Sequence, residues 1–96
     1  MKVAIYGRNF DSGFREYIER FFEILISNNV EITIFKNFYD FLSKEIKLDS
    51  ELISTFHKHH EIKGNVDLLF SIGGDGTILD ATTVVRDSNI PIVGIN

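Results

Sequence analysis

Short runs of apolar residues along this chain alternate with longer stretches in which apolar residues recur at helical spacing. Four apolar or alternating runs predict β-strands near residues 2–6, 30–35, 66–72 and 91–95. Between the first two strands, apolar residues recur three and four positions apart from Phe14 to Ile26. This spacing predicts a helix with one apolar face.

The rest of the chain holds two further predicted helices and one ambiguous segment. Apolar residues from Phe38 to Ile46 predict a short helix, and a second helix is predicted from Thr77 to about Arg86. The segment from Lys47 to Gly64 is polar, with only a thin stripe of apolar residues. It fits either a helix or a mobile loop.

Strands that alternate with helices favour a parallel sheet with helices on both faces. We therefore predict an α/β fold with a Rossmann-like, doubly wound parallel sheet of about four strands. Ligands of such sheets gather at the carboxyl ends of the strands, where Gly7, Arg8, residues 73–77 and Asn96 are expected. Because the chain stops directly after a strand, we expect residues 1–96 to be an incomplete N-terminal nucleotide-binding domain.

Composition and charge narrow the possible classes of protein. The chain has 96 residues, of which 44% are hydrophobic and 25% charged, as in one small globular domain. A formal net charge of −4 argues against nucleic acid or an anionic membrane as partner. The chain has no cysteine, no apolar run long enough to span a membrane and no signal peptide. We therefore expect a cytoplasmic protein.

The most informative segment is Ser71-Ile72-Gly73-Gly74-Asp75-Gly76-Thr77, which lies between a predicted strand and a predicted helix. Its three glycines permit a tight turn and let a ligand approach the backbone. Free N–H groups at the start of the next helix then attract an anion. A carboxylate fits such a cradle as a group that binds a hydroxyl or a metal, which makes Asp75 the candidate for chemistry. The simpler alternative is a turn in which Asp75 or Thr77 only caps the helix.

Two further sets of residues have both a structural and a functional interpretation. Arg8 follows a strand and either meets phosphate at the sheet edge or is an ordinary surface residue. His57, His59 and His60 suggest a metal site, but no other ligand has convincing spacing. We therefore expect these histidines to be solvated, and we predict no metal-ligating residue.

The Gly-Gly-Asp-Gly-Thr turn resembles the signature of the NAD kinase family. The chain is similar to this family in three other places: the first strand that ends at Gly7-Arg8, the run Ile78-Leu79-Asp80-Ala81, and the strand from Ile90 that leads into Asn96. Diacylglycerol kinases, sphingosine kinases and phosphofructokinases carry related glycine loops, so the loop alone is less specific than the full set of motifs.

The resemblance implies that ATP phosphorylates the 2′-hydroxyl of the adenosine ribose of NAD, with Mg²⁺ as the divalent metal. It matches Asp75 to the residue that accepts the proton of that hydroxyl, and it implies a second, mostly β domain beyond these residues. Asp80 departs from the family, because many members carry a basic residue there. The predicted nucleotide-binding residues are Gly73, Gly74, Asp75, Gly76, Thr77, Arg8, Asp80 and Asn96.

Two alternative functions remain open on the sequence. One is a lipid kinase of the diacylglycerol or sphingosine type, and the other is a nucleotide-binding module without catalysis. A last strand without a following helix leaves apolar surface exposed, so we also expect a homo-oligomer.

Overall fold

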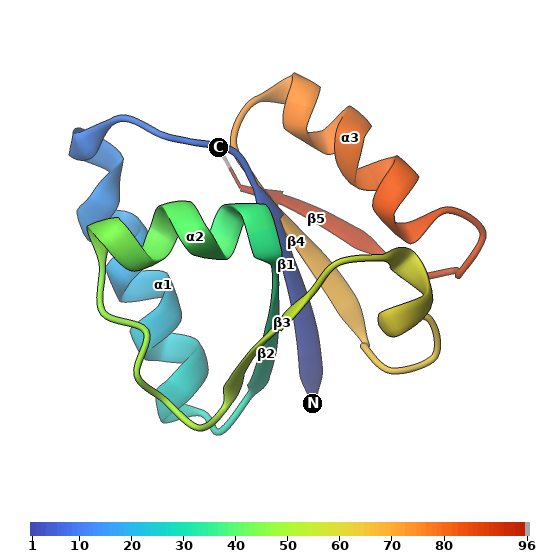
Figure 1. Ribbon diagram of the computed structural model, residues 1–96, viewed down its shortest axis with the longest axis horizontal. Coiled ribbons are helices and arrows are strands. Elements are labelled where there is room, and N and C mark those ends of the chain that lie inside the picture. The colour runs from blue at the N-terminus through green and yellow to red at the C-terminus, as the bar shows by residue number, and fades with distance from the viewer. Residues whose placement is uncertain (96) are drawn as a thin grey trace.

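The computed structural model describes residues 1–95, except for the side chain of Asp75. Five parallel strands form one sheet in the order β3-β2-β1-β4-β5 (Figure 1). The strands are β1 (Lys2–Gly7), β2 (Glu31–Phe35), β3 (Ile53–Phe56), β4 (Leu68–Ile72) and β5 (Ile92–Ile95). The helices are α1 (Arg15–Ser27), α2 (Lys36–Glu45) and α3 (Asp75–Val85), with short 3-10 turns at Ser12–Phe14 and His59–Glu61. The predicted α/β fold with an all-parallel sheet is confirmed.

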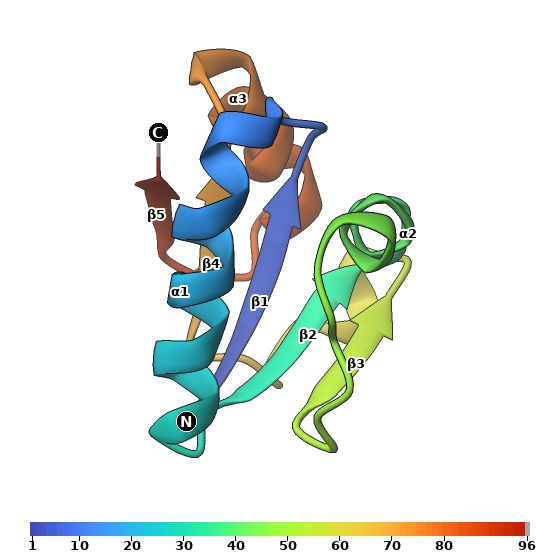
Figure 2. The same ribbon diagram turned by 90° about the vertical axis from the view of Figure 1, so that its left-hand side faces the viewer.

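Helices cover both faces of the sheet, as predicted. Figure 2 shows α1 and α2 on one side of the sheet and α3 on the other. Alternate residues of β1 point to opposite faces, so Val3 and Ile5 pack in the core under α1 and α2, whereas Ala4 packs in the core under α3. Each face therefore has its own hydrophobic core, and the central strands are buried on both sides.

The segment from Lys47 to Gly64 differs from both alternatives considered for it. Ile53–Phe56 forms β3, an edge strand that pairs in parallel with β2 and adds a fifth strand to the sheet. The pattern is weak because Ser54 and Thr55 are exposed at the edge, while Phe56 alone is fully buried. The prediction of a helix or a mobile loop is therefore wrong for these residues.

The strand order creates a crevice at one edge of the sheet. The chain runs outward from β1 to β2 and β3, then returns to the other side of β1 through β4 and β5. Neighbouring connections thus leave β1 and β4 in opposite directions, and this switch point is where ligands bind in doubly wound sheets. Gly7 pairs with Ile72, so the residues that follow β1 and β4 lie side by side at this edge.

Candidate functional site

The glycine turn after β4 has a backbone conformation that only glycine adopts easily. Gly73 has φ of 140°, and a Cβ atom built on it would lie 2.5 Å from Oγ1 of Thr77. The N–H of Gly73 donates to the carbonyl of Ile95 at 2.9 Å, which ties the turn to β5. The turn is therefore fixed in shape by the sheet on one side and by Thr77 on the other.

The start of α3 leaves its backbone amides open. Gly74 is the N-cap residue, and no side chain among those that the structure describes caps the helix. Apart from their chain neighbours and the backbone of α3 itself, Cβ atoms built on Gly74 or Gly76 would meet no atom within 4 Å. Thr77 is buried, and its N–H donates to the carbonyl of Gly74 at 3.0 Å. The turn therefore presents uncapped amides to open space, which is the arrangement that binds anions. The buried side chain of Thr77 packs against the turn and supports it.

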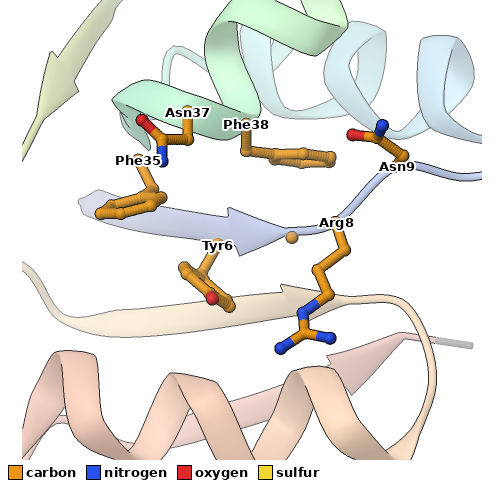
Figure 3. Close-up of a pocket in the computed structure, with 7 residues that line it drawn as sticks. Tyr6, Arg8, Asn9, Phe35, Asn37 and Phe38 are labelled. Atoms are coloured by element: carbon orange, nitrogen blue, oxygen red, sulfur yellow. The ribbon is translucent and has the colours of Figure 1, made fainter.

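Arg8 and Asp80 form an ion pair across the crevice, from the end of β1 to α3. The side chain of Arg8 is 60% exposed and that of Asp80 is 36% exposed. In Figure 3 the Arg8 side chain extends away from Asn37 and Phe38. The structure thus brings together two predicted site residues, and the carboxylate offsets the positive charge of Arg8.

Two cavities adjoin the crevice. The first, of about 490 Å³, lies at the ends of β1 and β2 (Figure 3), and the second, of about 420 Å³, lies beside the glycine turn. Asn9 lines both cavities, so they are neighbours at the same edge of the sheet. The first is lined by Tyr6, Gly7, Arg8, Asn9, Phe35, Asn37 and Phe38, and the second by Asn9, Phe10, Asp11, Phe14, Gly73 and Gly74.

Sequence reasoning missed the aromatic lining of the first cavity. Phe38 was assigned only to a helix core, yet a Cβ atom on Gly7 would lie 2.6 Å from its ring. The available signal was the place of Phe35 at the end of a predicted strand, followed at once by a helix. Such a junction without a loop brings the first turn of α2 to the carboxyl edge, where ligands gather.

The three histidines lie away from the glycine turn. His57, His59 and His60 line a separate cavity of about 470 Å³ with the C-terminal part of α3. Among the described residues, no group of three or more His, Cys, Asp or Glu side chains is arranged to hold a metal ion. The carboxylate of Glu61 accepts hydrogen bonds from the N–H groups of Lys58 at 2.6 Å and His57 at 2.7 Å, and these bonds lower its pKa.

Two predicted site residues lie outside what the structure describes. They are Asn96 and the side chain of Asp75, whose backbone begins α3. Their predicted roles stay predictions. Across residues 1–95, no helix is long and apolar enough to cross a membrane.

Comparison with known proteins identifies the family of this chain. Residues 3–96 match the family described as the ATP-NAD kinase N-terminal domain. The chain is 40% identical over 96 residues to the NAD kinase of Flavobacterium johnsoniae and 33% identical over 96 residues to that of Bacteroides fragilis. It is 33% identical over 97 residues to the NAD kinase of Methanothermobacter thermautotrophicus.

These alignments cover 100% of this chain but only 32%, 32% and 31% of the three relatives. The chain thus spans about a third of the length of the curated relatives it matches. The family match includes β1, β4 and the glycine turn, which border the crevice. The chain belongs to the ATP-NAD kinase N-terminal domain family.

Proposed function

We propose that the protein containing this chain transfers the γ-phosphoryl group of ATP to the 2′-hydroxyl of the adenosine ribose of NAD, which gives NADP and ADP. The observation that carries the proposal is the glycine turn, whose uncapped amides open α3 at the switch point of the sheet. Membership of the ATP-NAD kinase N-terminal domain family supports the choice of substrates.

In this proposal the glycines hold phosphate and Asp75 handles the acceptor hydroxyl. Phosphoryl transfer depends mainly on positioning and on neutralisation of charge. Gly74 and Gly76 leave space for phosphate oxygens to reach backbone amides, while Gly73 shapes the turn. Asp75 accepts the hydrogen bond of the 2′-hydroxyl, orients it for attack, and takes its proton as the new P–O bond forms.

Mg²⁺ is expected to enter with the nucleotide. Sites of this kind hold Mg²⁺ through one or two carboxylates together with substrate phosphates. Within the described residues no three-ligand group is available, and the carboxylate of Asp80 is engaged by Arg8. We therefore propose that the metal is bound mainly by the phosphates of ATP.

The remaining contacts are proposed to come from elsewhere. Residues 1–96 would be the N-terminal α/β part of the enzyme, in keeping with their 32% share of a relative's length. Asn96 and a second, mostly β domain would complete the acceptor site. We also propose a cytoplasmic homo-oligomer, in line with the exposed apolar residues Val93 and Tyr17 near the end of the sheet.

The test uses the complete protein, including any polypeptide that follows residue 96. It is incubated with Mg²⁺, ATP and NAD, and NADP is measured with an NADP-specific dehydrogenase. Parallel reactions replace NAD with diacylglycerol or sphingosine. Formation of NADP supports the proposal. Phosphorylation of a lipid alone, or nucleotide binding without any transfer, would overturn it in favour of one of the two alternatives.

A further inference from the structure

The cavity that contains the three histidines, here called the histidine cavity, lies between the segment after β3 and the C-terminal part of α3 (Figure 1). Its volume of about 470 Å³ is in the range of small-molecule sites. Its lining contains Lys58, Arg86 and the three histidines, and no acidic residue. We propose that this cavity binds a small anion that carries phosphate groups. This site is independent of the proposed function, because it lies away from the glycine turn.

The two permanent cations of the histidine cavity come from different segments and are available to a ligand. Both Lys58 and Arg86 are exposed, and among the described residues neither of them forms an ion pair. The Nε–H of Arg86 donates to the carbonyl of Thr83 at 3.3 Å, which holds the guanidinium against the last turn of α3 and leaves its terminal N–H groups for other partners. A guanidinium and an ammonium are the side-chain groups that proteins use to bind phosphate oxygens.

The histidines add hydrogen-bond donors to these charges. The rings of His59 and His60 meet edge to face, with centroids 6.3 Å apart, and His57 lines the same cavity. An imidazole ring carries at least one N–H group in either protonation state, so it can donate to a phosphate oxygen. Within the described residues no group of three or more His, Cys, Asp or Glu side chains is arranged to hold a metal ion. The composition of the lining therefore favours an anion over a metal ion as the ligand.

The walls of the histidine cavity are fixed by the hydrophobic core under α3. Phe56 and Ile62 flank the histidine segment, are each 1% exposed, and pack in the same core cluster as Val85 of α3. The carboxylate of Glu61 accepts hydrogen bonds from two backbone N–H groups of the segment, at 2.6 and 2.7 Å. These bonds close the segment into a compact turn and engage its acidic side chain. Binding therefore requires little ordering of the backbone, which lowers its cost in free energy.

The C-terminal end of a helix normally repels an anion, and in α3 this repulsion is reduced. The backbone N–H of Arg86 donates to the carbonyl of Thr82 at 2.9 Å, and its side chain donates to that of Thr83. The N–H of Ser88 donates to the carbonyl of Val85 at 3.0 Å. Most carbonyls of the last turn thus have a donor, and a guanidinium lies beside them. General attraction does not explain the site either, since the chain has a net charge of −4.

The experiment titrates the complete protein with inorganic pyrophosphate and follows the imidazole resonances of isotopically labelled histidine by NMR. Substitution of each histidine by glutamine assigns its resonance. The 11 residues of α3 span about 16 Å, so these resonances report binding at the histidine cavity and not at the glycine turn. Sodium chloride at equal ionic strength is the control for screening. Citrate, an anion without phosphate, tests the chemical class of the ligand.

We expect pyrophosphate to shift the resonances of all three histidines with one Kd. Arg86→Gln and Lys58→Gln should each raise this Kd about tenfold, as loss of one charge-assisted hydrogen bond implies. Arg86→Lys keeps the charge and should raise the Kd less than Arg86→Gln does. Lys44→Gln is the matched control, because Lys44 is an exposed cation in the last turn of α2, on the opposite face of the sheet (Figure 2). It should change the Kd by less than about twofold, since distant exposed charges are screened.

Lys58 is exposed, so its variant keeps the test valid if Arg86→Gln does not fold. Three results of the titrations would overturn the inference: resonances that pyrophosphate leaves unchanged, equal shifts with chloride, or tighter binding of citrate. An equal effect of Lys44→Gln would show general attraction to the surface in place of a site. A lower free energy of unfolding in Lys58→Gln and Arg86→Gln, with an unchanged Kd, would show that the two cations only stabilise the end of α3.

Discussion

Adjacent glycines of the turn should respond in opposite ways to the same substitution. Gly73 has φ of 140°, a region that side chains disfavour, and an added Cβ would lie 2.5 Å from Oγ1 of Thr77. Gly74 has φ of −86° and ψ of −169°, which is ordinary extended backbone, and an added Cβ would meet no atom within 4 Å apart from its chain neighbours. Gly73→Ala is therefore a test of folding, and Gly74→Ala is a test of binding.

The structure sets the size of each effect. The backbone strain of alanine at position 73 costs about 1–3 kcal/mol, and overlap with a packed side chain costs about 1–3 kcal/mol more. Thr77 is 3% exposed and β-branched, so it has little freedom to move aside. We expect Gly73→Ala to lower the free energy of unfolding by at least about 2 kcal/mol. Gly74→Ala should leave it unchanged or raise it by up to about 1 kcal/mol, because alanine restricts the unfolded chain.

Two measurements on the complete protein test this: the free energy of unfolding in urea, and the affinities for ATP and NAD by calorimetry. Equal slopes of the unfolding free energy against urea would show that the variants unfold from comparable states. Gly74→Ala should weaken binding of the nucleotide at the turn about tenfold, since its methyl group occupies the space of a phosphate oxygen. Wild-type stability of Gly73→Ala would refute the strained geometry, and wild-type affinity of Gly74→Ala would show that no phosphate approaches the turn.

The remaining predictions concern chemistry, packing, pH and assembly. Asp75→Asn should keep most affinity for NAD and lose most turnover, because the amide cannot take a proton; a variant with wild-type turnover in the NADP assay would remove Asp75 from the chemistry. Ser71 is fully buried and its hydroxyl has no hydrogen-bond partner among the described residues, so Ser71→Ala should stabilise the protein to urea by about 1 kcal/mol, and a loss of stability would show that the hydroxyl has a partner. The pKa of Glu61 is lowered from 4.5 by the N–H groups of Lys58 and His57, so the contribution of this carboxylate to the free energy of unfolding is present above pH 4.5 and is lost as the pH falls through the folded-state pKa. The stability advantage of the wild type over Glu61→Gln should therefore shrink between pH 7 and pH 3, and an advantage independent of pH would contradict this. The 96-residue chain alone should self-associate and form no NADP, since Val93 is 42% exposed and Tyr17 71% exposed near an apolar cavity of about 290 Å³; light scattering after size-exclusion chromatography that finds a monomer, or NADP formation by this chain, would contradict it.

The strands that carry the site were predictable because their patterns are strong. β1, β2, β4 and β5 lie within two residues of the predicted bounds, since buried or alternating β-branched residues mark them clearly. β3 has four residues, two of them exposed at the edge of the sheet, so its pattern did not stand out from a polar segment. Pairing with β2 and burial of Phe56 in the core under α3 stabilise β3, and neither contact is visible in a local sequence pattern.

The site divides in the same way between local and tertiary features. The glycine turn was predictable because three glycines in four positions mark a turn, and the φ of Gly73 favours glycine. The ion pair of Arg8 with Asp80 depends on the register that sets Gly7 opposite Ile72, which no local pattern contains. The aromatic cavity likewise depends on the packing of Phe38 over Gly7, and so the sequence pattern showed only a core residue and a strand end.

The charges of the site explain how an acidic chain can favour phosphate ligands. The net charge is −4, and the one cation at the end of β1 is paired with Asp80. In the proposed function, attraction for phosphate would therefore come mainly from the uncapped amides of α2 and α3, which begin at the same edge of the sheet. Such helix-end interactions fade within the first turn, so they favour only a ligand that touches the backbone, whereas a basic patch attracts any polyanion. Contact of that kind requires the open space above Gly74 and Gly76, so in the proposed function the shape of the turn, more than its charge, would be the source of selectivity.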